Sequence, residues 1–184
     1  MRRRERLEPK DQRIYTIRSS DGGGLARITN AGGAAHIPID YSPDGTQIVF
    51  GRVDPNDHSC TKRSALFVVN VDGSGLRRIT PWGFCDNDGS WSPDGSTIAF
   101  VKPDGSIFVV HLDGTGLAKI PLDPKDSAGD VAWSPDGTKI VFILSTPTSP
   151  EGIATANADG ADVQQVKTSP TFGHQPDWGS HPAT

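Results

Sequence analysis

Trp91-Ser92-Pro93-Asp94-Gly95, followed by the apolar triplet Ile98-Ala99-Phe100, is the stretch that decides the fold of this chain, because it recurs. The turn sequence returns at Tyr41-Ser42-Pro43-Asp44-Gly45 and at Trp133-Ser134-Pro135-Asp136-Gly137, and a reduced copy begins at Trp178. The aromatic residues that open the copies are 50, 42 and 45 residues apart. A period of this size indicates a repeat architecture, in which each unit buries its apolar faces against its neighbours.

Each whole copy continues with the same series of segments. The triplet is followed by a second apolar segment that ends in Asp-Gly, and then by a last short segment with two apolar residues. The Asp-Gly pairs stand at 72–73, 113–114 and 159–160, and residues 14–28 repeat this second half alone around Asp21-Gly22. Proline presets one turn position, glycine adopts the positive φ of another, and Asp-Gly between apolar segments predicts a hairpin. We therefore interpret the repeated aspartates as turn residues, and expect Asp72, Asp113 and Asp159 between two strands.

The repeated unit predicts an all-β protein. Glycine (21) and proline (15) make up about a fifth of the 184 residues, which indicates many turns. No segment shows sustained helical periodicity. Four short antiparallel strands per unit are typical of a β-propeller blade, so we predict a propeller of four-stranded antiparallel blades. Trp91 and Trp133 are expected at equivalent positions near the start of the first strand of their blades.

The stretch from Trp91 to Leu117, and Asp72-Gly73-Ser74-Gly75-Leu76 with the Arg77-Arg78-Ile79-Thr80 that follows, resemble the TolB-like propeller repeat, a WD-like repeat carrying Trp-Ser-Pro-Asp-Gly. The resemblance implies the fold, and many unrelated activities share it. Such propellers usually have six or seven blades and act mostly outside the cytoplasm as protein-binding platforms. Similar repeats also form the propeller of prolyl-oligopeptidase-like serine peptidases.

The repeats divide the chain into segments. We expect a disordered basic tail at 1–12, propeller repeats over 13–179 and a short tail at 180–184. Within the repeats we expect a half blade at 13–30, blades at 36–81, 86–121 and 128–167, and a terminal strand at 174–179. If the segment at Trp178 pairs with the N-terminal hairpin, about four blades close into a ring. If it does not, the chain is a partial arc of a larger propeller, whose exposed apolar faces would favour a homodimer.

Composition and motifs exclude several functions. The net charge of −4 gives no reason to expect a nucleic-acid partner, although Arg2, Arg3, Arg4 and Arg6 crowd the N-terminus. No apolar stretch approaches the ~20 residues of a membrane span, and no signal peptide is recognisable. The resemblance suggests a periplasmic or extracellular location. No G-x-S-x-G nucleophile motif is present, so we expect no enzyme activity and no cofactor in this chain.

Most candidate binding residues lie near the first strand of each unit or in the loop that leads to it, and His58 lies in the long loop 51–64 between the second and third strands of the first whole blade. Two further candidates, Trp82 and Phe84, either form an exposed partner-binding patch or cover the gap between two blades. The histidines and aspartates fit no compact metal motif, so we expect no metal; a polar loop without a ligand is the alternative reading. The binding candidates are His36, Asp40, His58, Trp82, Phe84, Asp86, Asp88, Asp130, His174 and Asp177.

The expected function is a non-catalytic module that recognises a protein or peptide through its loop face. One alternative is the propeller portion of a prolyl-oligopeptidase-like serine hydrolase, and another is a metal-dependent lactonase or lyase. Cys60 and Cys85 fall in two loops that emerge on the same face of a propeller, which makes them a disulfide candidate. The other interpretation is two unrelated thiols.

Overall fold

The computed structural model describes residues 12–30, 34–54, 64–84, 88–148 and 151–168, together with Pro176 and Trp178. These residues form strands, turns and bends and no helix. The strands are β1 (Tyr15–Thr16), β2 (Ala26–Arg27), β3 (Ala35–Tyr41), β4 (Gln47–Val53), β5 (Ala65–Asn70), β6 (Arg77–Arg78), β7 (Gly89–Trp91), β8 (Thr97–Val101), β9 (Ile107–His111), β10 (Ala118–Lys119), β11 (Ser127–Trp133), β12 (Lys139–Ser145), β13 (Gly152–Asn157) and β14 (Gln164–Thr168).

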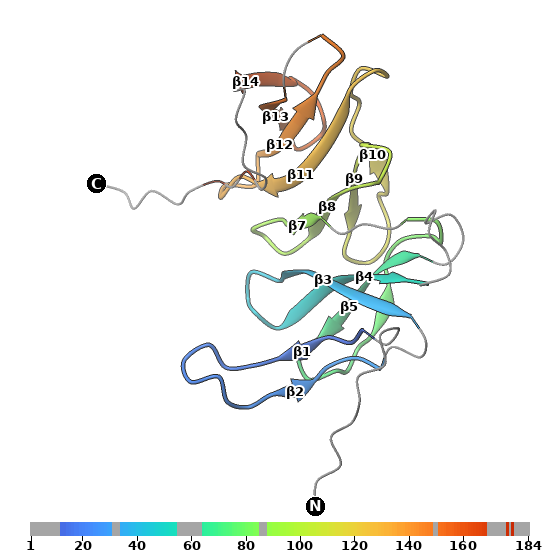
Figure 1. The fold of residues 1–184 in the computed structure, drawn as a ribbon, viewed down its shortest axis with the longest axis vertical. Helices are drawn as coiled ribbons and strands as arrows, with labels where there is room; N and C mark the ends of the chain where they lie inside the picture. Colours follow the sequence, from blue (N-terminus) through green and yellow to red (C-terminus); the bar gives the residue numbers. More distant parts are fainter. Residues whose placement is uncertain are drawn as a thin grey trace, which may run out of the picture.

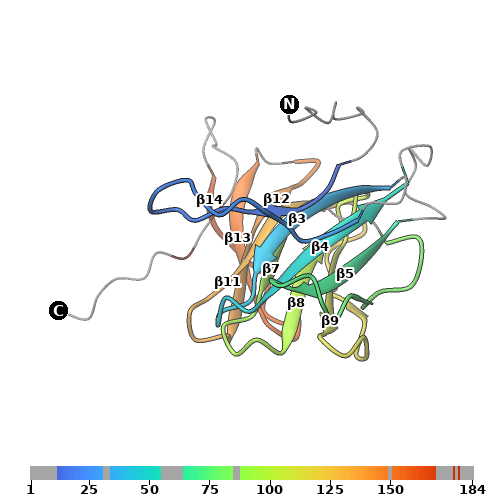
Figure 2. The ribbon, with the colours of Figure 1, turned by 90° about the horizontal axis from the view of Figure 1, so that it is seen from below.

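The strands assemble into three four-stranded antiparallel sheets and one hairpin, which confirms the predicted fold class. In each sheet the strands follow chain order, β3 to β6, β7 to β10 and β11 to β14, and β1 pairs with β2. Figure 1 shows these sheets stacked along the longest axis, with the β1–β2 hairpin at one end and β11–β14 at the other. Figure 2, turned by 90°, looks along this stack, and the successive sheets overlap in it.

Turn chemistry ends the strands where the repeat predicts. Ser92 Oγ donates to Asp94 Oδ1 over 2.6 Å and accepts the backbone N–H of Thr97 over 2.9 Å, which closes the Ser-Pro-Asp-Gly turn. Asp72, Asp113 and Asp159 lie in turns between the third and fourth strands, as expected. Each of the three carboxylates accepts a backbone N–H two residues later, over 2.8 to 2.9 Å.

The two repeat tryptophans occupy equivalent positions, but not near the start of the first strand. Trp91 pairs with Ile98 and Trp133 pairs with Ile140. Each is the last residue of its strand, so the predicted placement within the strand is wrong. The reason is local: the turn begins directly after the tryptophan, and the strand extends back over residues that carry no apolar alternation.

The core lies between neighbouring sheets. Phe50, Phe100 and Phe142, each from the second strand of a sheet, are fully buried. Phe50 belongs to the cluster between the hairpin and the first sheet, and Phe100 and Phe142 belong to the next two clusters along the stack. Burying one such side chain contributes roughly 1.5–3 kcal/mol, so the contact between sheets is a main source of stability.

The described residues form an open arc. Pro176 lies beside Val131 and Ala132 of β11, at the end of the stack opposite the hairpin. β1 pairs only with β2 among the described residues, and of the predicted terminal strand 174–179 only Pro176 and Trp178 are described. A partial propeller is the reading that fits.

Candidate axial site

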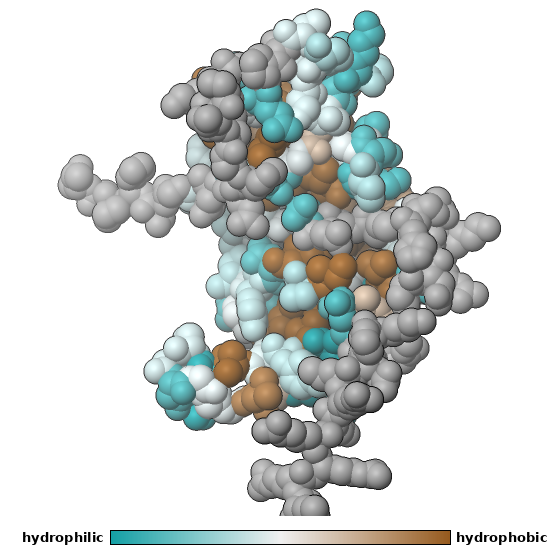
Figure 3. All heavy atoms as spheres, in the orientation of Figure 1, coloured by the Kyte–Doolittle hydropathy of each residue, from teal (hydrophilic) through white to brown (hydrophobic). Residues whose placement is uncertain are grey.

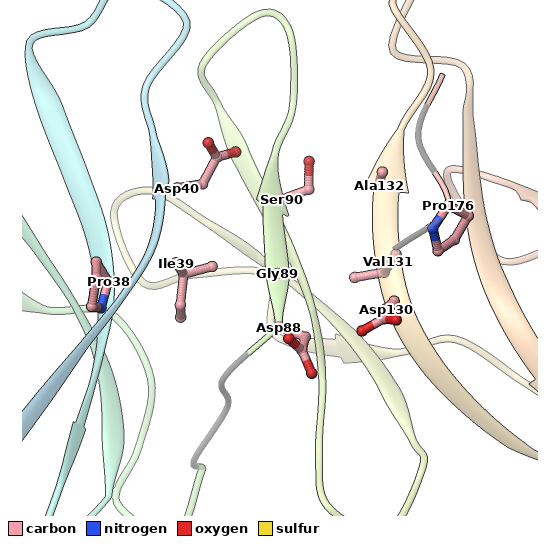
Figure 4. A pocket seen from close by; sticks show the side chains of 10 residues that line it. All are labelled: Pro38, Ile39, Asp40, Asp88, Gly89, Ser90, Asp130, Val131, Ala132 and Pro176. Carbon is pink, nitrogen blue, oxygen red and sulfur yellow. The ribbon is translucent and has the colours of Figure 1, made fainter. Parts of the chain in front are cut away.

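The inner strands of the three sheets enclose a pocket of about 650 Å³, here called the axial pocket. It is formed where β3, β7 and β11, the first strands of the sheets, face one another, with Pro176 beside β11 (Figure 4). First strands meet in this way because each blade repeats the same order of strands. The lining residues are Pro38, Ile39, Asp40, Asp88, Gly89, Ser90, Asp130, Val131, Ala132 and Pro176.

Three predicted site residues, Asp40, Asp88 and Asp130, come together in this pocket at two levels. Asp88 and Asp130 stand three residues before Trp91 and Trp133, so they occupy equivalent positions in two repeats. Asp40 stands one residue before Tyr41, and Figure 4 shows it level with Ser90, apart from the two other carboxylates.

Backbone irregularity places the Asp130 side chain. The register between β11 and β12 shifts between Gly129 and Val131, which marks a β-bulge, and Asp130 adopts a φ of 41°. A positive φ is uncommon for residues other than glycine, and bulges often redirect a side chain next to a binding site. The Asp130 carboxylate thereby faces the start of β7, directly before which Asp88 lies (Figure 4).

The electrostatics of the pocket favour a positively charged ligand. Burial raises the pKa of Asp40 above its usual value, although its hydrogen bonds from Trp91 and Tyr41 oppose the shift. The pKa of Asp88 is raised by burial and by the negative charge of Asp130. Raised pKa values mean that the pocket disfavours the negative form of each group. Among the described residues, those that line the pocket include three carboxylates and neither lysine nor arginine, so a cation would relieve this repulsion.

The described part of the chain holds no group of three or more His, Cys, Asp or Glu side chains arranged to bind a metal ion. The three carboxylates of the axial pocket are therefore spread over its wall.

His36, another predicted residue, lies outside the axial pocket. It is a buried residue of β3, and its ring centroid is 4.9 Å from that of Phe50. Its Nδ1 lies 2.8 Å from Thr29 Oγ1, within hydrogen-bond distance. The structure thus places His36 in the core between the hairpin and the first sheet.

Trp82 and Phe84, in the connection from β6 to β7, have different surroundings. The Phe84 ring packs edge-on against Phe108, 5.3 Å between centroids, and against Phe100, both in the second sheet. It also packs against the apolar cluster between the first and second sheets, and so covers their junction. Trp82 stays exposed, with the Arg78 guanidinium 4.9 Å from its ring centroid. Of the two, only Trp82 presents an aromatic surface to a partner.

Other predictions fall outside the described residues, where the structure gives no placement. They concern the N-terminal residues 1–11, the C-terminal residues 180–184 and six side chains: His58, Cys60, Cys85, Asp86, His174 and Asp177.

Several lining residues were not predicted. Ser90 and Ala132 hold the position equivalent to Asp40, and counting back from the repeat tryptophans would have identified them. Nothing in the sequence marks Pro38, Ile39 and Val131 as binding residues, because their side chains are apolar. They line the pocket because the first strands converge there.

Comparisons with known proteins agree with this architecture. The family model described as the TolB beta propeller domain matches residues 7–182. The structure of TolB from Acinetobacter baumannii is similar, with a TM-score of 0.67 and 19% identity, over 89% of this chain and 40% of that one. An oligogalacturonate lyase in complex with manganese gives a TM-score of 0.73 at 18% identity, over 89% of this chain and 50% of that one. At such identities the likeness concerns the fold.

Two curated relatives match parts of the sequence. An uncharacterized protein of Agrobacterium fabrum is 36% identical over 95 residues, 52% of this chain and 30% of that protein. Dipeptidyl-peptidase 5 of Porphyromonas gingivalis is 36% identical over 64 residues, 35% of this chain and 9% of that protein. The chain thus spans less than a third of either relative. Within its described residues no helix is long and apolar enough to cross a membrane.

Proposed function

Since the chain belongs to the TolB beta propeller family, we propose that it is a non-catalytic binding module that recognises a protein or peptide through its loop face. By loop face we mean the side of the sheets at which the first strands begin, where the β6–β7 connection carries Trp82. Asp88 stands directly before β7 on this side.

The convergence of Asp88 and Asp130 in the axial pocket is the observation that carries the proposal. Two repeats contribute a carboxylate at the same position, and Asp130 is held there by a bulge. A lysine or arginine side chain of a partner would form charge-assisted hydrogen bonds with these groups, which are the stronger kind. A cationic partner group would also offset the burial and the repulsion that raise the pKa of Asp88.

Trp82 supplies a second, apolar contact on the loop face. It is exposed and lies beneath the Arg78 guanidinium. Aromatic side chains and arginines are enriched among the residues that contribute most to protein interfaces. A polypeptide with a basic residue in the axial pocket and an apolar segment along Trp82 fits both features. An extracytoplasmic location, proposed on the family resemblance, would suit such a module.

Peptide titration tests the proposal. A fluorescently labelled Gly-Lys-Gly-Arg-Gly peptide is titrated with the wild-type chain and with the double variant Asp88→Asn, Asp130→Asn. We expect at least a tenfold loss of affinity in the double variant. Asp159→Asn removes a surface charge remote from the pocket and should leave affinity within twofold. An equal loss of affinity in the double variant and in Asp159→Asn would show that only the net charge matters, and would contradict the proposal.

The similarity to dipeptidyl-peptidase 5 favours a second candidate, the propeller portion of a prolyl-oligopeptidase-like serine hydrolase. In that role the axial pocket would contact peptide on its way to a catalytic domain. Labelling the native gene product with a fluorophosphonate probe tests this candidate, because only a nucleophilic serine reacts.

A further inference from the structure

The β1–β2 hairpin repeats the outer half of a blade. Ile28 N donates to Ile14 O over 2.9 Å, as Ile79 N donates to Leu66 O over 2.9 Å in the first sheet. Likewise, Ile14 N donates to the hydroxyl of Thr29, as Leu66 N donates to that of Thr80. Ile14 is therefore equivalent to Leu66, and the next residues follow: Tyr15 matches Phe67, and Ile17 matches Val69.

The inner neighbour of this half blade is absent from the described residues. In the first sheet β4 pairs with β5, and Phe67 lies opposite Phe50 and Val69 opposite Ile48. β1 pairs with β2 alone, through Tyr15 opposite Arg27 and Thr16 opposite Ala26. Because backbone hydrogen bonding alternates along an antiparallel strand, the N–H and C=O groups of Tyr15 and Ile17 face the edge away from β2.

Apolar side chains around this edge are exposed where their equivalents are buried. Tyr15 and Ile17 are 41% and 58% exposed, against 7% for Phe67 and 1% for Val69. Tyr41 is 50% exposed, whereas Trp91, at the same position in the next repeat, is 5% exposed. Figure 3 shows apolar atoms at the surface of the hairpin, at the foot of the molecule. In the whole sheets the inner strands of a blade cover these positions, and the hairpin has no such strands among the described residues.

A groove of about 520 Å³ lies along the same edge, between β1 and β3. Its lining residues are Arg13, Ile14, Tyr15, Pro38, Ile39, Asp40, Tyr41 and Ile48. The groove, the unpaired strand edge and the exposed aromatic rings meet at one place, here called the strand slot.

We propose that the strand slot accepts an extended segment of a partner polypeptide, antiparallel to β1, with side chains in the order Ile-x-Phe. The three whole sheets define this chemistry, because β4, β8 and β12 each carry Ile-x-Phe next to their third strand. The Phe50 and Phe67 rings stack with centroids 5.8 Å apart, and Phe100 and Phe108 repeat this distance. A donated Phe would stack on Tyr15 in the same way, and the Ile would pack on Ile17.

A partner, not a second copy of the chain, fits the slot. The three Ile-x-Phe segments of the chain are each paired on both sides within their own sheet. Donating one of them would break two strand pairings to form one. Addition of a strand at an open edge is a common mode of peptide recognition. The strand slot involves neither Asp88 nor Asp130, so its test is independent of the proposed binding in the axial pocket.

A peptide with the sequence of residues 46–52, Thr-Gln-Ile-Val-Phe-Gly-Arg, extended by two glutamates for solubility, is the probe. Fluorescence anisotropy should show saturable binding, and a peptide with Asp in place of Phe should bind at least tenfold more weakly. In the chain, Ile17→Asp should weaken binding at least tenfold. Leu25→Asp, at a residue just before β2 that is also exposed, should change it less than twofold.

Amide hydrogen exchange of the complex distinguishes strand addition from adhesion to an apolar patch. The bound peptide should slow exchange of the Tyr15 and Ile17 amides at least tenfold. Absence of saturable binding, unprotected amides, or equal losses from Ile17→Asp and Leu25→Asp would overturn the proposal. So would a dimer of the chain alone, seen by light scattering and abolished by Ile17→Asp, since it would assign the slot to a second copy.

Discussion

The carboxylate of Asp40 accepts a 2.9 Å hydrogen bond from the backbone N–H of Trp91, and thereby joins the inner strands of two neighbouring sheets. Its second oxygen accepts the N–H of Tyr41 over 2.8 Å. At the next junction the donor again lies in the later sheet, where Trp133 Nε1 donates to the carbonyl of Ser90 over 3.2 Å. Polar bonds at the axis thus complement the apolar contacts farther out.

Removing the Asp40 carboxylate should destabilise the first junction. Asp40→Ala should lower the free energy of unfolding by about 1.5–3 kcal/mol, the usual effect of losing hydrogen bonds to a charged group. Asp40→Asn keeps one acceptor and removes the cost of burying a charge, so its effect should be smaller. Urea denaturation measures both variants, and a larger loss for Asn than for Ala would contradict the assignment.

Phe100 is predicted to be among the residues most sensitive to truncation. It is fully buried between two sheets and stacks on Phe108. Phe100→Ala should therefore lower the free energy of unfolding by about 3–5 kcal/mol. Leu76→Ala, at an exposed residue, serves as the control and should stay within about 0.5 kcal/mol. Similar effects of the two in chemical denaturation would argue against packing between sheets.

Two turn glycines should respond differently to alanine. Gly45 and Gly105 both have positive φ, 70° and 76°. A Cβ at Gly45 meets no atom within 4 Å, so Gly45→Ala should cost only the roughly 1–2 kcal/mol of the left-handed conformation. A Cβ at Gly105 would collide with Ser127 of the next sheet, which should add about 1–3 kcal/mol. Equal melting temperatures for the two variants would show that this junction is looser than described.

At low pH the fold should lose stability that the Ser-Pro-Asp-Gly turns contribute at neutral pH. Hydrogen bonds from Ser134 and Thr138 lower the pKa of Asp136 from 3.8 to about 2. Because folding lowers this pKa, the ionised carboxylate stabilises the fold above about pH 4. That stabilisation is lost as the pH falls towards 2. In thermal melts from pH 5 to 2, Asp136→Asn should lose less stability than the wild type. If the melting temperatures of the wild type and of Asp136→Asn fell in parallel with pH, Asp136 would not be the source of the acid sensitivity.

The repeat chemistry explains why most of the fold could be predicted from the sequence. Ser-Pro-Asp-Gly and Asp-Gly determine turns locally, and the Ile-x-Phe triplets identify strands buried on both faces. The position of the tryptophans at the ends of β7 and β11 could not be predicted, because the residues before them show no apolar alternation. The same limit applies to the candidate site. Asp88 and Asp130 look like polar loop residues until the first strands converge, and His36 resembles them in sequence although it packs on Phe50.

Chemical-shift mapping of the ¹⁵N-labelled chain with the Gly-Lys-Gly-Arg-Gly peptide tests the central claim, the binding of a basic polypeptide in the axial pocket, most directly. The account predicts saturable shifts at the amides that line it, those of Gly89, Ser90, Val131 and Ala132. The turns of Asp44, Asp94 and Asp136 carry as many carboxylates on an exposed surface. Shifts confined to those turns, with the axial amides unchanged, would contradict the account.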